Sequence, residues 1–276
     1  MITDATFVIV GVVFLFVLGA IWGSFANVVI ARVPEGRSVV RPRSACPRCN
    51  TPIAARDNIP ILSWMILRGS CRHCKETIST RYPLVEASTG ALFVVWGGWA
   101  LVTDHLGLLP LLLIWSVVGI SLTVIDLDHR RLPNLITLPM LVLTPLGLAL
   151  ASVIDQPGLV GASGWVGAGI GAAIWFGVIG LLWLITGGRG MGLGDVKLAP
   201  SLGATLGWLS VGVAGIGLFA AFVLGAVVSI VLLLARRVGR RSAVPFGPFL
   251  FAGTALAIMV GEPLAQAYVG LFTLGS

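Results

Sequence analysis

The sequence predicts an all-α polytopic membrane protein with about eight transmembrane helices and a cytoplasmic zinc-binding loop module. Of its 276 residues, 57% are hydrophobic and only 11% are charged, whereas a soluble domain has about 25% charged residues. Apolar runs of roughly 18 residues or more, the length that crosses a bilayer, recur along the chain. All four cysteines lie in the longest polar segment. These observations argue against a soluble globular core.

Eight apolar segments are expected to span the bilayer. The first apolar run, 7–29, is too long for the apolar region of a signal peptide, and only Asp4 is charged before it, so we expect it to be retained. The sixth segment is short and glycine-rich, and Glu262 and Pro263 interrupt the eighth, so we expect both to be tilted, broken or partly re-entrant. The segments are 5–30, 84–103, 106–125, 134–154, 159–186, 196–208, 211–235 and 247–268.

The distribution of charge predicts that the N-terminus lies outside. In that orientation all 18 Lys and Arg residues fall at the cytoplasmic face, in Lys197 and in the segments 31–83, 126–133, 187–195 and 236–246. The outer segments contain four acidic residues and no Lys or Arg, which is the asymmetry that the positive-inside rule describes. The net charge of +7 therefore reflects membrane topology. We expect the lipid bilayer as a partner and no nucleic acid.

Two Cys-x-x-Cys pairs with 21 residues between them predict a tetrahedral zinc site. A cytoplasmic loop lies in a reducing compartment, which favours metal over two disulfides or free thiols. Four protein ligands leave no open position, so the zinc is expected to be structural and to supply folding energy to a small module. His73 is an alternative ligand, and Arg48, Arg72 and Lys75 are expected to offset the thiolate charge. The four ligands are Cys46, Cys49, Cys71 and Cys74.

Two carboxylates are predicted at the cytoplasmic ends of apolar segments, Asp126 in VIDLDHRRLPN and Asp195 in GMGLGDVK. If both face one cavity they share one proton, because two close carboxylates cannot easily both ionise. The ionised one would take a proton from water and the protonated one would donate to a peptide carbonyl, which is aspartic proteolysis. The sequence leaves open whether the two side chains meet. A transporter coupling ions through paired carboxylates, or a non-enzymatic assembly factor that docks through the zinc module, remains an alternative.

The residues around these carboxylates have both structural and functional interpretations. Asp128 is interpreted as an interfacial or supporting residue. Gly192 and Gly194 allow the backbone to approach either an extended substrate or a closely packed helix. Lys197 either orients Asp195 or extends to the lipid headgroups.

Together the motifs resemble the prepilin peptidases, or type IV leader peptidases, which are membrane aspartic peptidases with a GxGD motif. GLGD at 192–195 matches that motif. The segment 126–134, DLDHRRLPN, resembles the first-aspartate motif, in which the catalytic carboxylate stands about seven residues before the proline and is thus Asp126 rather than Asp128. With the two cysteine pairs, other segments follow in family order: GSFANVVIARVP (23–34), DNIPILSW (57–64), STRYPLVE (79–86) and VPFGPFL (244–250). The resemblance covers nearly the whole chain.

The resemblance implies a bifunctional enzyme of the bacterial inner membrane with Asp126 and Asp195 as catalytic residues. Family members cleave the basic leader of type IV prepilins and pseudopilins after a glycine at the cytoplasmic face. Many then methylate the new N-terminal residue, often Phe, with S-adenosylmethionine, and the long cysteine loop accompanies this bifunctional form. A peptidase without methyl transfer is the alternative. The sequence contains no strand–GxGxxG–helix unit, and Asn58 and Glu86 are interpreted as a turn residue and a span-start cap rather than as methyl-transfer residues.

The resemblance also suggests a division of the chain into three parts. Residues 1–30 form the first transmembrane helix, 31–83 the four-cysteine zinc module associated with methyl transfer, and 84–276 the transmembrane aspartic peptidase domain. The sequence predicts no particular oligomeric state.

Overall fold

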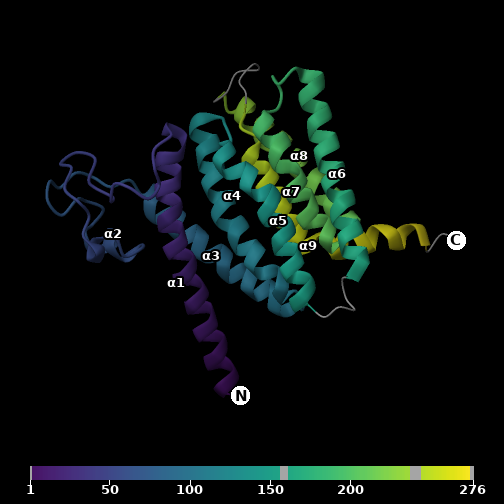
Figure 1. The fold of residues 1–276 in the computed structure, drawn as a ribbon, viewed down its shortest axis with the longest axis horizontal. Helices are drawn as coiled ribbons and strands as arrows, with labels where there is room; N and C mark the ends of the chain where they lie inside the picture. Colours follow the sequence, from purple (N-terminus) through teal and green to yellow (C-terminus); the bar gives the residue numbers. More distant parts are fainter. Residues whose placement is uncertain (1, 156–160, 237–243, 274–276) are drawn as a thin grey trace. The chain divides into compact units, whose positions relative to one another are not determined.

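The computed structural model describes residues 2–155, 161–236 and 244–273 (Figure 1). Each of the eight predicted segments forms an α-helix. The remaining described elements are short: α2 (Leu62–Ile66) and three 3-10 turns, η1 (Val33–Glu35), η2 (Ala55–Asp57) and η3 (Leu106–Leu108). The long helices are α1 (Ile2–Arg32), α3 (Arg81–Val102), α4 (Leu109–His129), α5 (Asn134–Ile154), α6 (Gly161–Thr186), α7 (Leu193–Leu209), α8 (Val211–Leu234) and α9 (Gly247–Thr273). Residues 237–243 of the predicted basic segment 236–246 lie outside the described residues.

Seven of these helices are long and apolar enough to cross a membrane, so the protein is a polytopic helical membrane protein. The exception is α7, the predicted sixth span. Its 17 residues extend about 26 Å at about 1.5 Å per residue, which is short for a hydrocarbon core of about 30 Å. Most of its side chains are buried, because α5, α6, α8 and α9 all pack against it. The helix is therefore an interior element of the bundle.

The described chain divides into two compact units. The first comprises 1–105 and 112–121, and the second comprises 106–111 and 122–276. The predicted zinc ligands belong to the first unit. Both predicted catalytic aspartates belong to the second unit.

Small residues bring α1 and α3 together in the first unit. A Cβ added at Gly19 would lie 2.7 Å from the Cα of Gly90, and one added at Gly23 would lie 2.7 Å from the Cα of Glu86. Glycines four residues apart on one helix face let a second backbone approach closely, as in membrane GxxxG pairs. This packing places Glu86 directly beside α1.

The second unit uses the same principle between α6 and α7, which lie side by side in Figure 1. Gly167 lies against the carbonyl oxygen of Gly207, and Gly171 lies against that of Gly203. A Cβ at any of the four positions would collide with the facing backbone. The glycine-rich composition of the predicted sixth span therefore reflects close helix packing, and α7 is one continuous helix although Pro200 lies within it.

The last helix, α9, continues through the interruption expected at Glu262 and Pro263. Both residues lie inside a helix that runs from Gly247 to Thr273. Figure 1 shows that α9 changes direction before its C-terminal end. A proline removes one helical hydrogen bond and pushes on the preceding turn, so it bends a helix that packing holds together. The expected break is thus a bend.

Candidate functional site

Asp126 lies in the last turn of α4, where that helix ends. Arg130 takes a left-handed conformation with φ 52°, and its N–H donates to the Asp126 carbonyl oxygen at 2.8 Å. The Asp126 side chain is only 5% exposed. Its Oδ2 accepts a hydrogen bond from the backbone N–H of Gly247 at 3.0 Å. Gly247 is the first residue of α9, and a helix N-terminus suits a carboxylate because its N–H groups lack helical partners and carry a positive partial charge.

Asp195 lies at the start of another helix, in the first turn of α7, and is also 5% exposed. Its Oδ2 accepts from the backbone N–H of Gly192 at 3.0 Å, and Gly192 is the N-cap of that helix. Its Oδ1 is buried and has no hydrogen-bond partner among the described residues. An unpaired buried polar atom costs about 1–3 kcal/mol, or more if charged. Such an atom calls for a functional explanation.

The structure brings the two carboxylates together within the second unit. Asp126 lies close enough to act electrostatically on Asp195. Leu132, in the loop after α4, is only 8% exposed and lies between the starts of two helices. A Cβ at Gly194 would lie 2.7 Å from the Leu132 Cβ, and one at Gly247 would lie 3.3 Å from its Cδ2. The α4 end, the α7 start and the α9 start therefore pack around one buried leucine, and each contributes to the site.

The remaining residues predicted near the carboxylates have other neighbours. Asp128 is exposed and is rotated roughly 200° around α4 from Asp126, so it lies away from the buried face. The Lys197 ammonium donates to Oδ1 of Asn134 at 2.8 Å. Asn134 is the first residue of α5 and follows the N-cap Pro133. Lys197 therefore connects the α7 start to the α5 start.

The four cysteines of the first unit form a cluster whose sulfur atoms all lie within 4.8 Å of one another. The Sγ atoms of Cys46 and Cys74 are 3.7 Å apart. A tetrahedral zinc site with Zn–S bonds of about 2.3 Å has sulfur atoms about 3.8 Å apart, whereas a disulfide bond measures about 2.05 Å. All four cysteines are free. The donor set fits a structural zinc ion, and His73 is not part of the cluster.

The two cysteine turns share one backbone geometry. In each, the N–H of the first cysteine, Cys46 or Cys71, donates to the carbonyl oxygen five residues further on, at 3.0 and 2.8 Å. The residue after each second cysteine is left-handed, with φ 55° at Asn50 and φ 59° at Lys75. The repeated turn explains how a short polar segment presents two pairs of sulfur atoms to one point.

The thiols of the cluster differ in their protonation. Hydrogen bonds with the side chain and backbone of Thr51 lower the pKa of the Cys49 thiol to about 6. At Cys74 a backbone hydrogen bond with Glu76 acts to lower the pKa, but desolvation and the three neighbouring sulfur atoms together raise it to about 11. Four thiolates cannot coexist there without a cation. A divalent metal would supply that charge and release the remaining protons.

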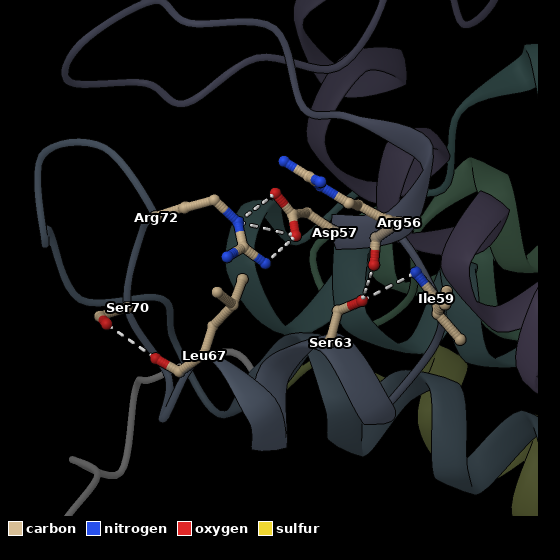
Figure 2. Close-up of polar contacts among 7 residues, drawn as sticks. All are labelled: Arg56, Asp57, Ile59, Ser63, Leu67, Ser70 and Arg72. Atoms are coloured by element: carbon tan, nitrogen blue, oxygen red, sulfur yellow. Dashed lines mark hydrogen bonds and ion pairs between the residues drawn. The ribbon is translucent and has the colours of Figure 1, made fainter.

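Two basic residues expected to offset thiolate charge instead pair with carboxylates. The Arg72 guanidinium binds Asp57 in η2 through Nε at 2.9 Å and Nη2 at 2.6 Å (Figure 2). The hydrogen bonds from Arg72 lower the pKa of the Asp57 carboxyl. Arg48 pairs with Glu76 at 2.6 Å. The first pair attaches the second cysteine turn to η2, and the other connects the two cysteine turns.

Comparison with known proteins gives two family matches. Residues 17–99 match the bacterial peptidase A24 N-terminal domain, and residues 111–230 match the type IV leader peptidase family. A protein of Aeromonas salmonicida is 37% identical over 287 residues, covering 93% of this chain and 92% of that protein. A protein of Aeromonas hydrophila is 37% identical over 289 residues (94% and 93%), and one of Stutzerimonas stutzeri is 35% identical over 292 residues (92% and 92%). Each is named prepilin leader peptidase/N-methyltransferase.

This chain belongs to the type IV leader peptidase family. The N-terminal family match contains the cysteine cluster with about half of α1 and most of α3, and the second match contains both aspartates. No solved structure matches the chain.

Gly247 is a residue of the candidate site to which the sequence analysis assigned no role. It lies beyond the second family match, and its partner Asp126 is 121 residues away in the chain. The available signal was the segment VPFGPFL, in which a glycine directly precedes a proline at the start of an apolar helix. Proline is tolerated in the first turn of a helix. The glycine has no side chain, so it leaves room for another group at the N-terminal end of α9.

Proposed function

We propose that the protein is a membrane aspartic endopeptidase that cleaves the basic leader of type IV prepilins and pseudopilins after a glycine. One observation carries this proposal. Asp126 and Asp195, 69 residues apart in the chain, form a buried carboxylate pair in which a glycine N–H at a helix start holds each partner. Membership of the type IV leader peptidase family supplies the substrate class.

The pair performs the chemistry by sharing one proton, because two close carboxylates do not easily both ionise. The ionised carboxylate takes a proton from water, and the resulting hydroxide adds to the carbonyl carbon of the scissile peptide bond. The protonated carboxylate donates to the carbonyl oxygen. As the carbon–nitrogen bond breaks, the carboxylate that took the water proton passes it to the amide nitrogen, and the other carboxylate takes a proton from a hydroxyl of the tetrahedral diol, which restores the one-proton state of the pair.

The contacts of the two side chains suit this role. Gly192 and Gly247 each occupy one oxygen, Oδ2, of the neighbouring aspartate. The unpaired Oδ1 of Asp195 is then available to water or to the shared proton. Because backbone amides hold both carboxylates, the site needs little rearrangement during the reaction.

The proposed location is the bacterial inner membrane, with the N-terminus outside and the cysteine module and both aspartates at the cytoplasmic face. The asymmetry of Lys and Arg supports this orientation. A prepilin has an apolar helix that can lie in lipid beside the spans, while its basic leader stays in the cytoplasm. The cleavage point then reaches the bilayer surface at the level of Asp126 and Asp195.

Methyl transfer to the new N-terminal residue is the proposed second activity, with S-adenosylmethionine as donor. The relatives' names include N-methyltransferase, and the N-terminal family match covers the cysteine module. The proposed division into 1–30, 31–83 and 84–276 assigns the structural zinc ion and methyl transfer to the N-terminal parts. A peptidase lacking methyl transfer is the alternative, and mass spectrometry of the mature pilin N-terminus with and without donor decides between them.

Leader cleavage by purified protein in liposomes tests the peptidase. We expect Asp126→Asn and Asp195→Asn to abolish cleavage of a prepilin while each variant remains inserted. Asp128→Asn is the matched control and should retain activity, because Asp128 is exposed. Full cleavage by either active-site variant refutes the two-aspartate mechanism. Ion flux without proteolysis would support the transporter alternative.

A further inference from the structure

Three sequence motifs that the peptidase mechanism does not use converge in the first unit. α1 contributes Ser24 from GSFANVVIARVP, the loop 57–64 contributes Asn58 and Pro60, and α3 contributes Glu86 from STRYPLVE. A cavity of about 290 Å³ opens between α1 and the loop. It is lined by Ile21, Ser24, Phe25, Val28, Asn58 and Pro60.

Glu86 is a buried carboxylate that contacts the cavity through its neighbours, although it is not itself one of the lining residues. It is only 8% exposed, and its Oε2 accepts the backbone N–H of Ile61 at 2.7 Å. Its side chain also forms a hydrogen bond with Ser24, which lines the cavity. A carboxylate offers about four acceptor positions, so these contacts leave some of them free. No Lys or Arg pairs with Glu86 within the described part of the chain.

The loop beside the cavity is strained at Ile61. This residue has φ 61° and ψ −53°, and the N–H of Leu62 donates to the Pro60 carbonyl oxygen at 2.6 Å. These values define the rare, strained form of the γ-turn, which costs a β-branched residue about 1–3 kcal/mol. The hydrogen bond from Ile61 to Glu86 holds the turn in place. Strained backbone beside a buried carboxylate and a cavity is typical of a functional site.

The Ser63 hydroxyl, next to this turn, holds the preceding residues of the loop in place. Ser63 accepts the N–H of Ile59 at 2.9 Å and donates to the Arg56 carbonyl oxygen at 3.1 Å (Figure 2). Together with the Arg72–Asp57 pair, these bonds attach the loop to the cysteine module on one side. Glu86 attaches it to α3 on the other side.

We propose that this cavity binds the new N-terminal residue of the mature pilin, with its apolar side chain in the cavity and its amine at Glu86. The proposal rests on methyl transfer as proposed above. Three apolar side chains, Ile21, Phe25 and Val28, suit a phenylalanine. An α-amine has a reference pKa of about 7.7–8.0 and is largely a cation at neutral pH, so it complements a buried carboxylate that lacks a basic partner.

The size of the cavity favours the acceptor over the methyl donor. Drug-sized ligands occupy pockets of about 300–1,000 Å³, and this cavity measures about 290 Å³. It suits one side chain with its amine better than a molecule that carries a nucleoside. The donor would approach from the open side of the amine.

The chemical step at Glu86 is a proton transfer followed by a substitution. The carboxylate takes one proton from the ammonium group, which leaves a lone pair on nitrogen. That lone pair forms a bond to the methyl carbon of a sulfonium donor as the carbon–sulfur bond breaks, and its electrons stay on sulfur as a thioether. The product is an N-methylammonium group, and Glu86 returns its proton to water.

A mature pilin peptide that begins with Phe tests the assignment, because it bypasses leader cleavage. In the presence of S-adenosylmethionine we expect Glu86→Gln to lower methylation at least about a hundredfold, as loss of a general base does, while prepilin cleavage is unchanged. Glu35→Gln is the matched control, since this carboxylate belongs to the same unit but is exposed, and it should keep both activities. Retained zinc in Glu86→Gln shows that the module is folded.

Peptide binding without donor gives a readout that does not depend on turnover. Wild type should bind the free-amine peptide more tightly than the N-acetylated peptide, and Glu86→Gln should lose that preference. Val28→Phe should fill the cavity and weaken binding of a peptide beginning with Phe more than one beginning with Ala. Unchanged methylation by Glu86→Gln, or equal wild-type binding of both amine forms, overturns the site. Absence of methylation by wild type overturns methyl transfer instead, while preferential free-amine binding still supports the site.

Discussion

Gly194 lies against Leu132 so closely that a Cβ at position 194 would stand 2.7 Å from the Cβ of the leucine. This contact joins the GxGD segment to the loop that follows Asp126. The other glycine of the motif differs, because the one close neighbour of a Cβ at Gly192 would be the carboxylate end of Asp195, at 3.2 Å, and the backbone N of Gly194 would lie at an ordinary 3.9 Å. Gly192 holds the Asp195 carboxylate through its N–H, whereas Gly194 leaves room for the loop that contains Leu132.

The two glycines should therefore respond differently to substitution. We expect Gly194→Ala to lower the free energy of unfolding by about 1–3 kcal/mol, the usual effect of overpacking, and to lose most leader cleavage. Gly192→Ala should fold with little loss of stability but lose part of the activity, because its new methyl group would press on the Asp195 carboxylate rather than on backbone. Thermal unfolding and cleavage rates in detergent measure both effects. Gly177→Ala is the control, since that position faces open space. Wild-type cleavage by Gly194→Ala would contradict the packing argument.

A side chain at Gly247 should be equally harmful, but here we expect the catalytic rate to fall. A Cβ there would lie 2.8 Å from Oδ2 of Asp126 and would displace the carboxylate that the Gly247 N–H holds. We expect Gly247→Ala to lower kcat by about a hundredfold, the scale for a catalytic group misplaced by about 1 Å, with a smaller change in KM. Gly215→Ala, in open space on α8, should cleave normally.

A double-mutant comparison separates this steric effect from general damage. Asp126→Ala removes the carboxylate that the new methyl group would meet. The loss of thermal stability caused by Gly247→Ala should therefore be smaller in the Asp126→Ala background than in wild type. Equal losses in the two backgrounds would place the damage elsewhere in α9.

Features within short stretches of the sequence predicted the helices, the carboxylates and the cysteines. The contacts that the sequence did not predict join segments that lie far apart in the chain. Apolar length located all eight helices, and residue type with spacing located the carboxylates and the cysteines. The interior position of α7 depends on glycines of α6 that face it, as Gly171 faces Gly203. The contact between Gly247 and Asp126 joins segments 121 residues apart. A single sequence does not show which distant segments pack together, so the donor to Asp126 could not be predicted, whereas the donor to Asp195 lies three residues away in the same motif.

Removal of the metal should affect the first unit. We expect purified wild type to contain about one zinc ion per chain, as four sulfur ligands imply, and Cys46→Ser to lose it. Because metal binding supplies folding energy to a small module, proteolysis within 31–83 should become faster in Cys46→Ser and in wild type treated with a chelator. His73→Ala is the matched control and should keep its zinc, since His73 lies outside the sulfur cluster. Loss of zinc in His73→Ala would indicate that His73, and not one of the four cysteines, is a zinc ligand.

The Asp57–Arg72 pair should contribute to the stability of the module only while the carboxylate is ionised. Hydrogen bonds from Arg72 lower the folded-state pKa of Asp57 from its ordinary value of 3.8. A lowered pKa means that the contribution is fully present above the unfolded value and is lost as the pH falls through the lower folded value. Asp57→Asn should therefore unfold the module more readily than wild type at pH 7, and the difference should shrink below pH 3.8 and vanish below the lowered folded-state pKa. Hydrogen exchange of residues 55–75 measures the difference, and the zinc content of both proteins is followed at each pH so that loss of the metal is not mistaken for loss of the ion pair. A difference that persists unchanged in acid would mean that Asp57 acts through packing rather than through charge.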